Sequence, residues 1–263
     1  MKKLFCTLLS AAAAVALLCG FTPSPQENSA GAGLITKTYE TAEAISSLSV
    51  SDKYADVTVK ADDVDHVVVE YSYNSSYNDA FGTGGELYSF TIAGPSLNIQ
   101  GLKGDASMSV NNSKCICTMT VKLPRRAFAG LTVDTSNGNL TIQDMTSQSN
   151  TLTTTNGNIS ITGGSLDNLN ATANNGKVEV NNLLTQTFAA STRNGRISLA
   201  NTSALSITAQ AQNGSINLDT VSAPSYRCTV TNSSVVGKLV GRASDYAFDL
   251  TPGNGRVTVT DNT

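Results

Sequence analysis

One dipeptide, Asn-Gly, recurs in this chain at intervals of 19 residues. Its five evenly spaced copies are Asn137-Gly138, Asn156-Gly157, Asn175-Gly176, Asn194-Gly195 and Asn213-Gly214. A single Asn-Gly between two alternating segments is typical of a β-hairpin. A hairpin does not require similar residues at every 19th position. Stacked coils do, because each residue then lies above its counterpart in the next coil. The repeat therefore predicts a solenoid in which the Asn-Gly pairs form a structural ladder.

Apolar residues recur with the same period on both sides of each Asn-Gly. The column that starts at Leu140 continues with Ile159, Val178, Ile197, Ile216 and Val235. Within each repeat these residues alternate with polar ones, so one face of each short strand points inward. The pattern predicts an all-β, single-stranded β-solenoid with seven 19-residue coils over residues 131–263, the last displaced by three extra residues. Parallel crossovers are almost always right-handed, so we expect a right-handed solenoid.

The chain before residue 131 has strand-like segments without this period. Leu48-Ser49-Val50, Val57-Thr58-Val59 and residues 119–123 alternate between apolar and polar side chains, and longer loops separate them. Alternation of this kind is typical of half-buried strands. We expect residues 35–130 to form irregular, longer coils of the same structure, so that residues 35–263 make one β-solenoid domain.

The N-terminus has the pattern of a secretory leader. Met1-Lys2-Lys3 precedes the uncharged residues 4–21, and Pro23 then breaks any helix. We expect a leader over residues 1–21 and a linker over residues 22–34. Two alternatives are an uncleaved membrane anchor and a lipoprotein that carries its lipid on Cys19. In all three cases the rest of the chain lies outside the cytoplasm, secreted or at the bacterial cell surface.

The low content of charge agrees with a stack. Charged residues make up 14% of the chain, and the net charge is −3. An outward charge on stacked coils meets its own kind one coil away, which destabilises the stack. The acidic balance also argues against nucleic acid and against anionic membrane surfaces as partners.

The cysteines predict buried thiols. Three lie beyond the leader, an odd number that makes a poor disulfide framework. Cys115 and Cys117 alternate with Met119 on one side of a predicted strand, and Cys228 falls in an apolar column. A metal site would need further Cys or His ligands at suitable spacing. We therefore predict no metal and no cofactor.

Several segments together resemble a known family. They are residues 47–71 (SLSVSDKYADVTVKADDVDHVVVEY), residues 121–145 (VKLPRRAFAGLTVDTSNGNLTIQDM) and the repeated NGxIxI units. They resemble the bacterial DUF4097 family of proposed adhesins, also called toast-rack domains, over about residues 35–263. Lys122-Leu123-Pro124, followed by Leu131 and Asn137-Gly138, is the most specific part. The resemblance implies a β-solenoid of the bacterial cell envelope with relatives near envelope-stress systems, and it supplies no catalytic residues.

The residues offer little for catalysis. His66, the single histidine, ends the acidic segment 62–66, which fits a solvated turn better than a calcium or metal site because no EF-hand spacing follows. No serine lies in a nucleophile elbow. The charged residues of 131–220 are scattered over different columns, whereas a polysaccharide-cleaving β-helix needs clustered carboxylates. We predict that the protein is not an enzyme, and the alternative is a carbohydrate-active β-helix enzyme.

Two regions could bind a partner. The first is an outward polar surface before each corner, with Thr153, Thr155, Thr172, Asn174, Ser191 and Arg193. Regular hydroxyl and amide groups suit glycans, although β-branched Thr also suits any solvated strand. The second is residues 72–89, which we expect to form a long ligand-binding loop that carries Tyr73, Tyr77, Phe81 and Tyr88. Its rings could stack on sugars, or the segment could cover an open end of the solenoid.

Together these features predict a non-enzymatic, adhesin-like protein of the cell envelope or the exterior. Its stacked polar faces would meet glycans or envelope proteins. The alternative is an envelope-stress sensor or scaffold.

Overall fold

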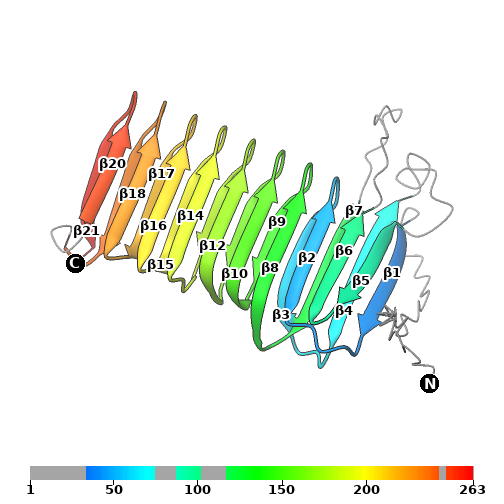
Figure 1. The fold of residues 1–263 in the computed structure, drawn as a ribbon. Helices are drawn as coiled ribbons and strands as arrows, with labels where there is room; N and C mark the ends of the chain where they lie inside the picture. Colours follow the sequence, from blue (N-terminus) through cyan, green and yellow to red (C-terminus); the bar gives the residue numbers. More distant parts are fainter. Residues whose placement is uncertain (1–33, 75–86, 102–116, 243–246, 263) are drawn as a thin grey trace, which may run out of the picture.

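The computed structural model describes residues 34–74, 87–101, 117–242 and 247–262. The regular secondary structure of these residues is β-strand, arranged as two sheets that face each other along one long stack (Figure 1). They contain no helix long and apolar enough to cross a membrane. The predicted all-β class is confirmed. The predicted leader (1–21), with Cys19, and the linker up to residue 33 lie outside the described residues.

The strands fall into an N-terminal group and a regular group. The N-terminal strands are β1 (Leu34–Thr41), β2 (Ser47–Asp52), β3 (Asp56–Asp62), β4 (Val67–Asn74), β5 (Tyr88–Ala93), β6 (Ser96–Gly101) and β7 (Cys117–Pro124). The regular strands are β8 (Ala127–Thr135), β9 (Leu140–Gln143), β10 (Thr146–Thr154), β11 (Ile159–Thr162), β12 (Ser165–Ala173), β13 (Val178–Asn181), β14 (Thr187–Thr192), β15 (Ile197–Ser203), β16 (Ser206–Ala211), β17 (Ile216–Ser222), β18 (Ser225–Val230), β19 (Val235–Val240), β20 (Ala247–Pro252) and β21 (Val257–Asn262).

The regular strands repeat in space as they do in sequence. Each coil places one strand in the 10-stranded sheet and the next in the 11-stranded sheet, and neighbouring coils pair in parallel. Thr153 on β10 lies beside Thr172 on β12, which lies beside Ser191 on β14. The last step is longer, because Asn254 bonds to Asn232 across 22 residues. Seven coils from β8 to β21 confirm the predicted solenoid and its period.

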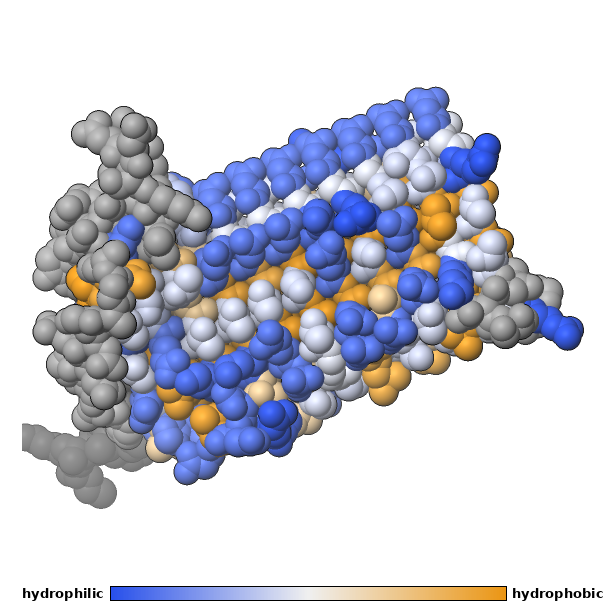
Figure 2. Space-filling model, turned by 180° about the vertical axis from the view of Figure 1, so that it is seen from behind, coloured by the Kyte–Doolittle hydropathy of each residue, from blue (hydrophilic) through white to orange (hydrophobic). Residues whose placement is uncertain are grey.

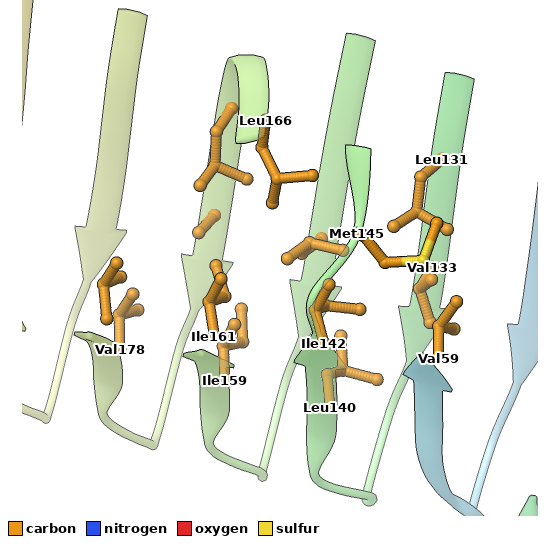
Figure 3. Close-up of a cluster of buried hydrophobic side chains, with 14 of the residues drawn as sticks. Val59, Leu131, Val133, Leu140, Ile142, Met145, Ile159, Ile161, Leu166 and Val178 are labelled. Atoms are coloured by element: carbon orange, nitrogen blue, oxygen red, sulfur yellow. The ribbon is translucent and has the colours of Figure 1, made fainter. Parts of the chain in front are cut away.

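The inward residues of both sheets meet in a continuous core, part of which Figure 3 shows in close-up. Leu140, Ile159 and Val178 lie one above the other in the 11-stranded sheet. Leu131 and Val133 join them from the 10-stranded sheet, and all five are at most 1% exposed. Burying a side chain of this size contributes about 1.5–3 kcal/mol. These columns therefore stabilise the coils in which they are fully buried, whereas Phe248, Leu250, Val257 and Val259 of the last coil are only partly buried.

The predicted burial of the thiols is confirmed where the structure describes them. Cys117 on β7 and Cys228 on β18 are both free and buried. Burial raises the pKa of the Cys228 thiol to about 12. Cys115 lies outside the described residues.

The N-terminal strands join the same two sheets in a different order. β2 is parallel to β8 and β3 is parallel to β9, so the β2–β3 coil lies directly against the first regular coil. β6 and β7 come later in the sequence but lie on the far side of that coil, beside β2 and β3. β1, β4 and β5 then add antiparallel strands at the end of the stack. The predicted irregular coils are present, but they do not stack in the order of the sequence.

Aromatic side chains fill the core at this N-terminal end. Tyr39 stacks on Phe90 and on Tyr71, with ring centroids 4.1 and 5.8 Å apart. Tyr71 also packs against Tyr73 and Tyr88, at 5.9 and 4.8 Å. Tyr73 and Tyr88 are only 4% and 3% exposed. Their assignment to a loop is therefore wrong, because both rings occupy inward positions of strands, on β4 and β5.

Candidate functional site

The outward side of the 10-stranded sheet carries a region of uncharged positions over β10, β12, β14 and β16, bordered on β12 by the partly exposed Asp167. We call this region the polar face. It consists of twelve outward positions: Ser149, Thr151, Thr153, Asn168, Asn170, Thr172, Thr187, Ala189, Ser191, Ser206, Thr208 and Gln210. Strand alternation turns them away from the core, and parallel pairing aligns them in three columns along the stack. All but Ala189 offer a hydroxyl or an amide.

The structure brings the six predicted face residues together. Three of them, Thr153, Thr172 and Ser191, form one column of the polar face. Thr155, Asn174 and Arg193 lie just past the ends of the same strands, at the corner of the coil. Backbone hydrogen bonds of 3.1 Å from Asn174 N to Thr154 O and of 3.2 Å from Arg193 N to Asn174 O hold these corners side by side. Their role in binding stays a prediction.

Hydrogen bonds between coils engage part of the polar face. The hydroxyl oxygens of Thr172 and Ser191 are 3.2 Å apart. Thr187 Oγ1 donates to Asn168 Oδ1 at 2.9 Å, and Asn168 Nδ2 donates to Gln148 O at 3.2 Å. Each hydroxyl keeps further donor or acceptor capacity toward solvent. Sugar hydroxyls also donate and accept, so they can replace water on such a surface.

Charged side chains lie at the margins of the polar face. Asp134 on β8 lies beside Thr153, and its partial burial raises the pKa of its carboxyl group. On the opposite margin, Arg227 on β18 and Asp249 on β20 form an ion pair of 3.3 Å. Arg193 flanks one corner. The interior of the face therefore suits a ligand without charge.

The asparagines of the Asn-Gly corners form a hydrogen-bonded ladder along one edge of the stack. Each Nδ2 donates to the Oδ1 of the asparagine in the preceding coil. These bonds run from Asn156 to Asn137, Asn175 to Asn156, Asn194 to Asn175, Asn213 to Asn194, Asn232 to Asn213 and Asn254 to Asn232, over 2.7–3.2 Å. Seen from behind, the molecule shows hydrophilic rows of this kind along the stack, with hydrophobic residues between them (Figure 2).

The glycines of these corners are required by the approach of neighbouring coils. A Cβ on Gly176 would lie 1.7 Å from Gly157 O, and a Cβ on Gly157 would lie 1.9 Å from Gly138 O. Any side chain there would collide with the backbone of the preceding coil. Thr154 Oγ1 donates to Gly138 O at 3.0 Å, which satisfies this buried carbonyl. The Asn-Gly pair is therefore a corner shaped for stacking and not a hairpin turn.

A second kind of corner was not predicted. Asp144, Asn182, Asn201 and Thr220 have positive φ angles of 53°, 55°, 47° and 56°, and Gly163 has one of 70° in the same column. Asp144, Gly163 and Asn182 lie where the chain leaves β9, β11 and β13, whereas Asn201 and Thr220 lie inside β15 and β17. Asp, Asn and Gly adopt this left-handed conformation most easily. Their recurrence at 19-residue steps is the signal that could have identified this corner.

The acidic segment around His66 is neutralised by neighbouring charges. His66 Nδ1 contacts Asp65, and Nε2 lies 3.4 Å from Glu40 Oε2. The hydrogen bonds to Asp65 and Glu40 raise the pKa of His66 above its ordinary value. Asp63 accepts a hydrogen bond of 2.8 Å from Arg125. Within the described residues, no three His, Cys, Asp or Glu side chains are placed to hold a metal ion.

The described residues do not form the predicted ligand-binding loop of aromatic side chains. Tyr73 and Tyr88 are core residues, so their rings do not face a ligand. Tyr77 and Phe81 lie outside the described residues. The alternative, a segment that closes one end of the solenoid, agrees with the positions of Tyr73 and Tyr88 on the antiparallel strands β4 and β5.

Comparison with known proteins identifies solved structures with a similar fold and the family of this chain. No curated protein shows significant similarity to the chain. A proposed adhesin from Bacteroides fragilis has a similar structure, with a TM-score of 0.56 and 17% identity, and the match covers 90% of this chain and 99% of the other. A proposed lipid-binding protein from Parabacteroides distasonis matches with a TM-score of 0.53 and 12% identity, over 88% and 98% of the two chains. At such identities the likeness shows the fold alone. The model of the family Toastrack DUF4097 matches residues 45–260, and the chain belongs to this family.

Proposed function

We propose that the protein is a non-enzymatic binding protein of the bacterial exterior, and that its polar face attaches to glycans. The observation that carries the proposal is the alignment of hydroxyl and amide groups in three uncharged columns. Attachment also fits the adhesin-like neighbours of this fold. The leader over residues 1–21 would place the face outside the cytoplasm, with lipid on Cys19 as one means of anchoring.

The composition of the polar face sets the expected strength of binding. Exchanging a water for a sugar hydroxyl contributes about 1 kcal/mol per hydrogen bond. The twelve positions include no aromatic residue on which a sugar ring could stack. A single sugar is therefore held weakly. A polymer that lies along the columns makes many bonds at once, because the strands repeat at about 4.8 Å, and gains affinity by avidity.

Binding of the whole protein to insoluble polysaccharides and to bacterial cell-wall glycans tests this proposal. Thr172→Lys places a bulky charge in the column of the polar face that lies next to the corners, and it is expected to abolish retention. Ser198→Lys is the matched control, because Ser198 is a half-buried outward residue on β15 in the other sheet. Equal retention of both variants would show that the polar face does not bind the glycan.

Two other results would change the assignment. Retention of an envelope protein but of no glycan would favour a scaffold role over glycan attachment. Release of soluble sugars from a purified polysaccharide, at a rate that persists through purification, would contradict the non-enzymatic part of the proposal.

A further inference from the structure

Six asparagines of the ladder are followed by glycine, and this pairing carries a chemical consequence. The six are Asn137, Asn156, Asn175, Asn194, Asn213 and Asn254, while Asn232 is followed by Ser233. In an Asn-Gly pair, the backbone nitrogen of glycine can attack the side-chain amide of the asparagine, because no neighbouring Cβ shields it. Replacing the glycine is costly at Gly157, Gly176 and Gly195, because a Cβ there would lie within 1.9 Å of a backbone oxygen, and Ser233 is the one ladder corner that holds another residue.

We infer that the ladder is a column of spontaneous deamidation sites, protected in its interior and open at Asn254. In the reaction, the nitrogen of Gly255 forms a bond to Cγ of Asn254 while the Cγ–Nδ2 bond breaks. The amide proton of Gly255 leaves with Nδ2 as ammonia, and a cyclic succinimide remains. Water then opens the succinimide to aspartate or isoaspartate. No oxidant and no enzyme are required.

Protection in the interior comes from hydrogen bonds on both sides of each amide. Asn175 Nδ2 donates to Asn156 Oδ1 at 2.8 Å, and Asn175 Oδ1 accepts from Asn194 Nδ2 at 2.7 Å. Rotating Cγ of Asn175 toward the next backbone nitrogen breaks both bonds. Asn254 is held by a single bond of 3.2 Å to Asn232, and no described residue donates to its Oδ1.

Deamidation of Asn254 also removes the hydrogen bond between Asn254 and Asn232. An aspartate at position 254 cannot donate, so two oxygens would face each other where Asn254 now bonds to Asn232. Asn232 then loses one of its two partners, but Ser233 follows it and slows succinimide formation there. The Asn232-Ser233 pair therefore stops the loss of amides from passing along the ladder to Asn213.

The test is to incubate the whole protein in mildly alkaline buffer, folded and in urea, and to measure deamidation of each site by peptide mass spectrometry. In the folded protein we expect Asn254 to react about fivefold or more faster than Asn175, the factor for one additional hydrogen bond. In urea the six sites should react at similar rates. Equal rates for Asn254 and Asn175 in the folded protein would overturn the inference.

Two variants distinguish protection by the ladder from fraying of the last coil as the cause of the different deamidation rates. Asn232→Ala removes the donor to Asn213 Oδ1, so Asn213 should deamidate severalfold faster while Asn156 stays unchanged. Thr231→Ala is the matched control, because Thr231 is the exposed neighbour of Asn232 and belongs to no ladder bond. An unchanged rate at Asn213 in Asn232→Ala would show that the ladder does not protect. Ser233→Gly removes the side chain that slows succinimide formation at Asn232, while Asn232 keeps its hydrogen bonds on both sides. Rapid deamidation of Asn232 in this variant would also show that the ladder does not protect.

Discussion

The β2–β3 coil and the regular coils have the same shape but reach it with different residues. In six of the seven regular coils the corner is an Asn-Gly pair, and in the other it is Asn232-Ser233. In the β2–β3 coil, Asp52 Oδ1 accepts hydrogen bonds from the backbone nitrogens of Tyr54 and Ala55, at 2.6 and 2.5 Å. The first ladder asparagine, Asn137, donates to Lys53 O at 3.2 Å, and Gly138 packs over Ala55 O. Stacking therefore requires a corner of the right shape and space for the next glycine, and the sequence period is only one way to supply them.

The two regions also differ in how their strands find partners. Regular coils that are consecutive in the sequence pair with one another, as in other solenoids. In the N-terminal region, β6 and β7 lie outside the β2–β3 coil, and antiparallel β1, β4 and β5 close that end. A solenoid end would otherwise expose unpaired strand edges and its core. The irregular region therefore serves as a cap, and the regular region as the extended surface.

The largest effect should come from emptying the core in each region. Phe188 in the regular stack and Tyr71 in the aromatic cluster are each 1% exposed. Replacing either with Ala is expected to cost about 3–5 kcal/mol of unfolding free energy. Because β2 and β3 pair directly with β8 and β9, we expect both variants to lower one common urea transition. Hydrogen exchange that showed the two regions opening separately would contradict this single unit.

The next largest effect is expected from glycine substitutions, whose cost in stability should differ between the two regions. Gly176→Ala forces a Cβ against Gly157 O and should destabilise the protein by about 3 kcal/mol. Gly94, in the β5–β6 turn, has open space around it but a positive φ of 58°. Gly94→Ala should therefore cost only about 1 kcal/mol. Asn is compatible with a positive φ, so Gly94→Asn should restore stability while Gly176→Asn should not. Equal losses in thermal unfolding for both alanine variants would refute the distinction.

A smaller effect concerns the left-handed corner, which belongs to the regular coils. Thr220 is the β-branched residue in a column that otherwise holds Asp, Gly and Asn. Thr220→Asn should raise the unfolding free energy by up to about 1 kcal/mol, since it removes the clash of a β-branched side chain at positive φ. Asn201→Thr should lower it by a similar amount. If both variants melt at the wild-type temperature, this corner carries no strain.

The smallest effect is expected where the two regions meet, at Asp134 between Ser51 and Thr153. Its carboxyl pKa is raised in the folded protein, so folding favours the protonated form. Stability from this group is complete below the pKa of the unfolded chain and is lost as the pH rises through the folded pKa. Asp134→Asn should therefore melt slightly higher than wild type at neutral pH and equally in acid. A constant difference at every pH would point to a cause other than titration.

The periodic part of the molecule was predictable because each 19-residue repeat pairs with the repeats next to it in the sequence. Leu140, Ile159 and Val178 had to align once the chain advanced one coil every 19 residues. The same logic aligned the ladder asparagines and the residues of the polar face. The left-handed corner was equally periodic, but its Asp, Asn and Thr residues resemble ordinary loop residues, so only the backbone angles identified it.

The sequence by itself therefore determined the coil, its period, its core columns and the absence of charge from the polar face. Each of these depends on residues that are neighbours along the chain or one repeat apart. Tertiary structure alone decided that β7 lies beside β3, that Tyr73 and Tyr88 are buried, and that the corner glycines are required for space. These features depend on pairing between strands far apart in the sequence and on contact between neighbouring coils. Their geometry appears only when the two sheets are assembled.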